Sequence, residues 1–430
     1  MTATPSAWSG VAEPRPVDAR WQAWRSSGAL LSAADVLAAL MAASLPWSTT
    51  APSILVGLWL LAVTPTIDWR DYARSLARPA FALPFAFLLL ALVGTLWSDG
   101  AWPDRLHAIK PIAKLVLIPP LLYHFSRSQR GFWVCLAFLA SCALLAVLSW
   151  IVLLDPAWKI TATVSAGVPV KNYIDQSQEF TLCAFALALP ALIFWRGGSR
   201  IATVACLALI LLFATNMVFV ASARTALLCI PVLLLLFAWR HLSRRAALVL
   251  LAGAVAASAL AWTTSSYLRQ RITDIAVEYR HGHEDISHAS TAQRLTYWRK
   301  SASAFLEAPW IGHGTGSIKR QFERAATGTS SLDTEIVNNP HNQTLNFAVQ
   351  WGLLGVVLLY AMWIAHLRLF SGAGLAAWIG LVVVVQNITS SLLNSHLSDF
   401  HEGWMYVLGV GVAGGMALRA GAARGISRQP

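Results

Sequence analysis

The chain has 430 residues, of which 57% are hydrophobic and only 12% are charged. Soluble domains average about 25% charged residues, and a soluble protein of this size could not cover so apolar a core with so few polar side chains. The net charge of +12 would suggest a nucleic-acid partner in a soluble protein. In a membrane protein, the positions of the basic residues instead indicate which loops lie in the cytoplasm. The composition excludes a soluble enzyme and predicts an all-α polytopic membrane protein in contact with lipid, without a nucleic-acid partner.

Twelve apolar runs approach the length of about 20 residues that a helix needs to cross a bilayer. The runs are 29–47, 51–67, 80–97, 107–125, 132–154, 178–195, 201–221, 225–241, 246–265, 344–367, 375–393 and 403–418. The fourth contains Pro119 and Pro120, which membrane helices tolerate where neighbours satisfy the freed carbonyl groups. All five cysteines lie inside these runs without CxxC spacing, so neither a disulfide framework nor a zinc site is predicted.

The short loops decide the orientation. With the N-terminus in the cytoplasm, every cytoplasmic segment carries at least one arginine, whereas the opposite short loops hold few basic residues. The positive-inside rule therefore places both termini in the cytoplasm; the opposite side is called the far side below. The predicted organisation is a cytoplasmic tail at 1–28, nine membrane helices in 29–265, a far-side loop at 266–343, three membrane helices in 344–418 and a cytoplasmic tail at 419–430.

The far-side loop at 266–343 is long and hydrophilic, and such loops are usually functional or disordered. Apolar residues recur at helical spacing from Leu295 to Phe305, which favours an ordered loop with a helix. A glycine-rich turn follows at 312–316. His281 and His283 stand near acidic residues, but their pattern is too weak to predict a metal site. No P-loop or nucleotide fingerprint occurs, so we expect no metal and no cofactor.

The most specific signal stands where the loop meets the tenth apolar run. Pro340 biases Asn339 toward an extended backbone, which puts His341 at a chain bend, and Asn342 follows directly. A neutral histidine here can accept a proton near pH 7, as a general base must. The alternative is that the residue caps the following helix. The glycine pair within 352–355 is predicted to permit close packing of helices.

Arginines supply the second signal. Arg224 lies at the far-side turn between two strongly apolar runs, where an arginine normally needs a partner. Its guanidinium suits bidentate binding of a phosphate, and the alternative is that it reaches out to lipid phosphates. Arg294 opens the loop helix, where it would add to the preference of a helix N-terminus for anions; the alternative is a solvated basic residue.

A basic group stands at the far-side start of the fourth run. It consists of Arg105, Lys110 and Lys114. The two lysines are four residues apart, which predicts a common helix face, and ammonium groups within a membrane helix are costly unless they meet anions. The group is predicted to face phosphate, with interaction with lipid headgroups or pairing to Asp99 or Asp104 as alternatives.

These residues together resemble the O-antigen ligase family. That family's loop ends in His-[Asn/Ser/Gln], nine residues and Gly-x-x-Gly, which His341-Asn342 and Gly352-Leu353-Leu354-Gly355 fit without a gap. Ser222-Ala223-Arg224 matches the family's Ser-x-Arg element. The helix around Arg294 and Tyr297 and the glycine turn after Pro309 match the ligase/polymerase domain pattern. The resemblance is detailed over about 200–355 and topological elsewhere.

The resemblance implies a metal-independent, inverting glycosyltransferase of the GT-C type in the bacterial inner membrane. It would transfer O-antigen from an undecaprenyl-diphosphate donor to a sugar hydroxyl of the lipid A-core acceptor, at a site facing the periplasm. In this interpretation His341 is the catalytic base. Arg224 and Arg294, with Lys110, Lys114 and Arg105, bind the diphosphate. The residues that position the acceptor or the loop are Asn342, Asn339, Tyr297 and His313.

Three other interpretations share parts of this pattern. An O-antigen polymerase or a protein O-oligosaccharyltransferase would use the same donor, although protein-glycosylating relatives tend to have longer C-terminal regions than this chain. A transporter with a gating loop is the alternative from another class. Transporters of that kind carry ionisable residues in mid-membrane and show internal symmetry. The centres of these apolar runs are almost free of charge and we find no internal symmetry, which disfavours transport.

Overall fold

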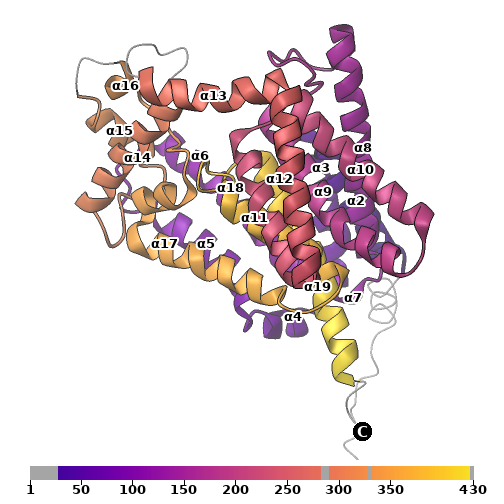
Figure 1. The fold of residues 1–430 in the computed structure, drawn as a ribbon. Helices are drawn as coiled ribbons and strands as arrows, with labels where there is room; N and C mark the ends of the chain where they lie inside the picture. Colours follow the sequence, from indigo (N-terminus) through magenta and orange to yellow (C-terminus); the bar gives the residue numbers. More distant parts are fainter. Residues whose placement is uncertain (1–27, 282–289, 328–330, 427–430) are drawn as a thin grey trace, which may run out of the picture.

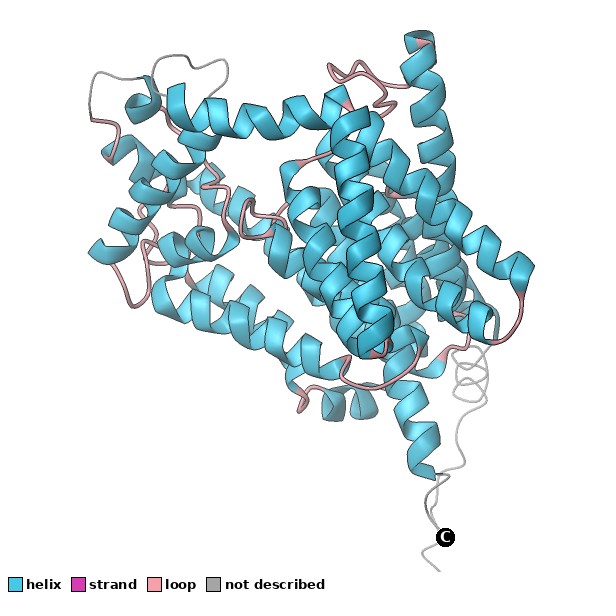
Figure 2. Cartoon of the chain, in the orientation of Figure 1, coloured by secondary structure: helices cyan, strands magenta, loops and turns pink. Residues whose placement is uncertain are grey.

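The computed structural model describes residues 28–281, 290–327 and 331–426, and all regular structure in these ranges is helical (Figure 2). The elements are α2 (Gly28–Ser44), α3 (Thr50–Val63), η1 (Thr64–Thr66), α4 (Trp69–Ser75), α5 (Pro79–Val93), α6 (Trp102–Ala113), η2 (Lys114–Leu117), α7 (Ile118–Arg127), α8 (Gly131–Leu154), η3 (Pro156–Trp158), α9 (Tyr173–Arg196), α10 (Arg200–Phe219), α11 (Arg224–His241), α12 (Arg244–Thr264), α13 (Ser266–His281), α14 (Ser290–Glu307), α15 (Ile318–Arg324), α16 (Ser331–Thr334), α17 (Gln343–Leu369), α18 (Leu375–Ser390) and α19 (Phe400–Ile426).

Each of the twelve apolar runs coincides with a helix or with consecutive helices. Among the described residues, eight helices are long and apolar enough to cross a membrane, and one of these is the combined stretch Trp102–Arg127. Three further apolar helices, α2, α5 and α18, are shorter than 18 residues. The second run, with α4 after it, is a helix pair bent by 108°. The all-helical, multi-pass membrane class predicted from composition is therefore confirmed.

The described helices of the hydrophilic stretch 266–343 gather at one end of the molecule. In Figure 1, α13 extends sideways from the end of α12, and α14, α15 and α16 form a group beside the bundle, above α17 and α5. The end of α19 and the arginine-bearing α4 lie at the opposite end. The arrangement separates the basic segments from the long loop, as the positive-inside rule requires of two sides of a membrane.

The final helix fits closely against α7. Gly411 stands against the side chain of Leu121, and Gly415 stands against Phe125, so closely that an added Cβ would lie 2.4 Å and 2.6 Å from the nearest atoms. Small residues let membrane helices approach closely because association there depends on packing and not on exclusion of water. This contact fixes the position of α19, whose first turn carries polar residues of the site described below.

The glycine pair in α17 has a different role from the predicted one. Gly352 has φ 58° and ψ −150°, a conformation that glycine alone adopts readily, and it interrupts the helix. The turn after α14 enters this break: Leu353 N donates to Pro309 O at 2.7 Å, and His313 N donates to Val349 O at 2.9 Å. The expectation of close packing between two helices was wrong here. Gly352 instead allows the turn at 309–316 to dock against the opened backbone of α17.

Candidate functional site

His341 occupies the bend between the far-side loop and α17. Its φ is +53°, a left-handed backbone that is unusual for a residue other than glycine. Its N–H donates to Oδ1 of Asn339 at 2.9 Å, and Pro340 between them is buried. A strained backbone held by local hydrogen bonds is typical of functional positions, where the surrounding structure must compensate its cost.

The imidazole has a fixed partner on the loop between α18 and α19. Nδ1 of His341 lies 2.7 Å from Oδ1 of Asn394. The backbone N–H of Ser395 also donates to this Oδ1, at 3.0 Å, which identifies the atom as the amide oxygen. Because an amide oxygen only accepts hydrogen bonds, Nδ1 carries the proton, and Nε2 is left with the basic lone pair.

The surroundings of His341 favour its neutral form. Burial lowers the pKa of the imidazole below its ordinary value, and the positive charge of Arg294 lowers it further, whereas Asn394 and Glu335 oppose the shift. The ring of Tyr297 stacks on the imidazole with centroids 6.1 Å apart and an interplanar angle of 25°. The structure therefore brings together three residues that the sequence analysis selected: His341, Tyr297 and Arg294.

The two asparagines beside the histidine anchor it. Asn342 caps α17 by accepting from Leu345 N at 3.0 Å, and its Nδ2 donates to Leu392 O at 2.9 Å. Asn339 accepts from Ser395 Oγ at 2.7 Å. The helix cap is thus made by Asn342 and not by His341, which leaves the imidazole available for another role.

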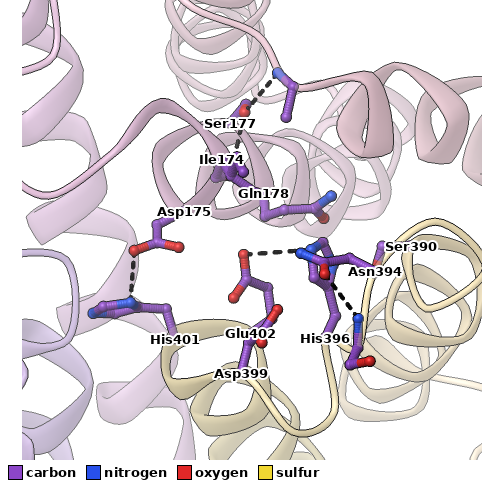
Figure 3. A network of polar contacts seen from close by, with 12 residues as sticks. Ile174, Asp175, Ser177, Gln178, Ser390, Asn394, His396, Asp399, His401 and Glu402 are labelled. Carbon is purple, nitrogen blue, oxygen red and sulfur yellow. Dashed lines mark hydrogen bonds and ion pairs between the residues drawn. The ribbon is translucent and has the colours of Figure 1, made fainter. Parts of the chain in front are cut away.

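Arg224 is the first residue of α11 and is half-buried. The preceding backbone is tied to α9, because Ala223 N donates to Ser177 Oγ at 3.0 Å. Ser177 belongs to a polar turn of α9 that also presents Asp175 and Gln178 to the centre of the molecule (Figure 3). One hydrogen bond therefore links the N-terminus of α11, where the arginine stands, to this polar turn.

The three basic residues of the fourth run do not form one group. Arg105 donates to the carbonyl oxygens of Gly100, Thr95 and Ser98 at 2.7–2.8 Å, so its guanidinium closes the loop after α5. Lys110 is exposed, whereas Lys114 is buried and donates to the carbonyl oxygens of Ser398 and Asp399. The α-helix ends at Ala113, after Pro111, and a 3-10 turn follows. The lysines consequently do not share the environment that regular helical spacing predicts.

His313 serves the glycine turn. Its Nε2 lies 2.8 Å from the carbonyl oxygen of Ala304, and Nδ1 lies 3.9 Å from a carboxylate oxygen of Asp99. Both contacts hold the turn that enters the break in α17. The structure therefore gives this residue a role in positioning the loop; the metal pattern around His283 and Asp285 lies outside the described residues.

A buried polar cluster, not foreseen from the sequence, lies next to His341. His401 Nδ1 is 2.6 Å from Asp175 Oδ2, and His396 Nε2 is 3.9 Å from Glu402 Oε1. Figure 3 shows these side chains converging from α9 on one side and, on the other, from the α18–α19 loop and the first turn of α19. Burial lowers the pKa of His396 to about 3, Asp175 opposes this shift, and Arg294 and His341 are near enough to contribute to it. The cluster therefore adjoins the site of the predicted base.

Three members of the cluster have metal-ligand chemistry. His396, Asp399 and Glu402 offer ligand atoms that lie within 4.8 Å of one another, an arrangement that is not evident from their spacing in the sequence. Burial raises the pKa of Asp399, and the positive charge of Lys114 opposes this shift. The chain itself thus supplies a positive charge beside the carboxylates of this cluster.

Together these features define a polytopic helical membrane protein with a polar site at the far-side ends of its helices, built around a neutral histidine and an arginine. Residues 209–360 match the model of a family described as O-Antigen ligase, a range that contains Arg224, Arg294 and His341. The match covers about a third of the chain, and over this range it confirms the resemblance to the O-antigen ligase family found in the sequence. Comparison with curated proteins found no match.

Proposed function

We propose that this protein is an O-antigen ligase. It transfers the O-antigen polysaccharide from an undecaprenyl-diphosphate donor to a sugar hydroxyl of the lipid A-core acceptor. The single observation that carries the proposal is the arrangement at His341, where Asn394 fixes the Nδ1–H tautomer and leaves Nε2 free to accept a proton.

The reaction needs a base for the acceptor hydroxyl. Nε2 of His341 takes the proton as the hydroxyl oxygen attacks the anomeric carbon, a role worth typically 10²–10⁴-fold in rate. The lowered pKa keeps the imidazole unprotonated at neutral pH, so that the base is present in the resting enzyme. A single displacement of this kind inverts the configuration at the anomeric carbon.

The reaction also needs positive charge for the leaving group. The bond from the anomeric carbon to the diphosphate breaks, and the electron pair leaves with the diphosphate oxygen. Arg224 and Arg294 are assigned to that developing charge, because guanidinium groups pair with phosphate oxygens in a bidentate manner. Arg105 receives no such role, because each of its three guanidinium nitrogens donates to a backbone carbonyl group. Lys114 acts on the buried cluster instead.

The donor already contains its leaving group, so no nucleotide or other cofactor is required. In this proposal the arginines and the buried Lys114 supply the positive charge that a metal ion provides in other glycosyltransferases, and the reaction is metal-independent. The cluster of His396, Asp399 and Glu402 could hold a metal ion, so it is the site at which metal independence can be tested directly.

The proposed setting is the bacterial inner membrane, with the site facing the periplasm. In this setting the protein is a twelve-span membrane glycosyltransferase of the GT-C type, in which the three shorter helices and the bent pair complete the set of eight long spans. The placement of the loop at 266–343 opposite the basic α4 supports this orientation.

A deletion strain tests the choice between ligase and polymerase. Loss of the ligase leaves lipid-linked O-antigen and bare lipid A-core, with no long-chain lipopolysaccharide. Loss of a polymerase leaves single repeat units attached to the core and removes only the longer polymers. Glycoproteins lost from the periplasm, with normal lipopolysaccharide, would instead identify a protein O-oligosaccharyltransferase.

A further inference from the structure

We propose that a polar cavity beside His341 is a binding site for a sugar ring of one of the two glycan substrates. This inference rests on the proposed function and names a part of its substrate site. The cavity has a volume of about 270 Å³ and lies between α6, α15, the segment before α17 and the segment before α19. Its principal polar residues are Asp104, His107, Asn338, Asn339, Asn346 and Gln350.

The cavity is linked directly to the predicted base. Asn339 lines it, and the Oδ1 atom of the same residue accepts the N–H of His341 at 2.9 Å. Ser395 Oγ donates to this oxygen at 2.7 Å. A sugar ring bound against Asn339 would therefore contact a residue that is hydrogen-bonded to the histidine that would take the proton.

The deeper wall is held rigid by hydrogen bonds. Gln350 Nε2 donates to Asn346 Oδ1 at 2.8 Å, and Gln350 Oε1 accepts from Gly316 N at 2.8 Å. Both side chains are buried. A wall that is ordered before binding lowers the entropic cost of recognising a ligand.

The rim carries the groups that remain for a ligand. The side chains of Asp104, His107 and Asn338 make no hydrogen bond to any residue within the described ranges. Together they offer a carboxylate acceptor, an imidazole and an amide that both donates and accepts. Such a set matches adjacent hydroxyl groups, each of which donates one hydrogen bond and accepts others.

The charge balance selects a neutral ligand. The cavity is lined by two carboxylates, Asp104 and Asp399, and by one ammonium group, Lys319. None of the arginines assigned to the diphosphate lines it. An anionic group would find no excess positive charge here, because Asp104 offsets Lys319 and the charge of Lys114 is directed at Asp399. The lining therefore favours a sugar over the phosphates of either lipid.

The test uses the purified full-length protein in lipid nanodiscs and the double variant Asp104→Ala/Asn338→Ala. Loss of two hydrogen bonds, each worth about fivefold in affinity, should raise the KM of one glycan substrate about 20-fold and leave kcat within about twofold. A raised KM for lipid A-core assigns the cavity to the acceptor, and a raised KM for the lipid-linked donor assigns it to the donor. Glu307→Ala, which removes an exposed far-side carboxylate outside the cavity, should change neither value.

A binding measurement separates this inference from the proposed function. Isothermal titration with core oligosaccharide released from lipid A, and with released O-antigen repeat, should show that the double variant binds one of them at least about fivefold more weakly than the wild type. Such weakening in a protein without ligase activity would retain the cavity and overturn the proposed function. Normal transfer with unchanged KM values and unchanged binding would overturn the cavity.

Discussion

Oδ1 of Asn394 accepts a 2.7 Å hydrogen bond from Nδ1 of His341, across a separation of 53 residues. The same oxygen is held by the N–H of Ser395, so the acceptor cannot turn away without breaking a second bond. The loop between α18 and α19 therefore decides which ring nitrogen of the histidine is basic. This relationship gives the buried loop a direct influence on the proposed proton transfer.

Replacement of Asn394 should move the pH dependence of transfer. In the wild type, burial and Arg294 hold the pKa of His341 below its ordinary value, so kcat/KM should fall only as pH drops below about 6.5. Asn394→Asp places a carboxylate beside the imidazole and raises its pKa, which should move the acidic limb upward by about one pH unit or more. Asn394→Leu should lower the rate and move the limb downward. Identical pH profiles in both variants would limit Asn394 to a packing role.

Arg224→Lys should impair transfer nearly as much as Arg224→Ala. Lysine keeps the positive charge but loses the planar pair of donors that fits a diphosphate. The comparison is made in single-turnover transfer from the lipid-linked donor, with both variants purified to the same folded fraction. Full activity of the lysine variant would show that the position needs only positive potential, and attraction to lipid headgroups would then explain it better.

Chelation with EDTA should leave transfer by the purified enzyme intact. The prediction rests on the positive charge that Lys114 provides beside the acidic cluster. Activity that disappears on chelation and returns with one specific divalent ion would contradict it. The site to examine would then be His396, Asp399 and Glu402, whose ligand atoms are already close together.

Gly352→Ala should destabilise the protein strongly. A Cβ at this position would lie 2.6 Å from the backbone of Trp310 and 2.7 Å from that of Ile311, in addition to the strained φ of +58°. We expect a loss of at least about 3 kcal/mol in stability, measured as a lower thermal denaturation midpoint in detergent. Gly198→Ala is the matched control, because its φ is +77° but its Cβ would meet open space. Equal midpoints for the two variants would mean that the docked turn contributes little.

Much of the fold follows from apolar length alone. Every apolar run predicted to be a membrane segment is helical in the structure. A chain segment that crosses a bilayer finds no water there, so its backbone must form hydrogen bonds within the segment. The role of Gly352 was not predictable in the same way. A glycine pair three residues apart has the same sequence pattern whether it packs against another helix or opens its own helix to a docking turn.

The site was predictable only in part, for a physical reason. His341, Arg294 and Tyr297 lie within the hydrophilic loop at 266–343, where their residue types and spacing can be recognised from the sequence alone. Asn394 and His396 come from the α18–α19 loop, and their roles depend on contacts with residues distant in the chain. One signal was present: Glu179 and Glu402 are carboxylates at the far-side ends of apolar runs, and an ionisable residue in such a segment points to function by default.

The most direct test of the account is the transfer rate of His341→Gln. Glutamine keeps the capacity to hydrogen-bond with Asn394, but it cannot accept a proton at neutral pH. The account predicts that transfer falls at least about a hundredfold, while the protein stays folded and donor binding persists, because diphosphate affinity is assigned to the arginines. Near-normal transfer by His341→Gln would contradict the assignment of His341 as the general base.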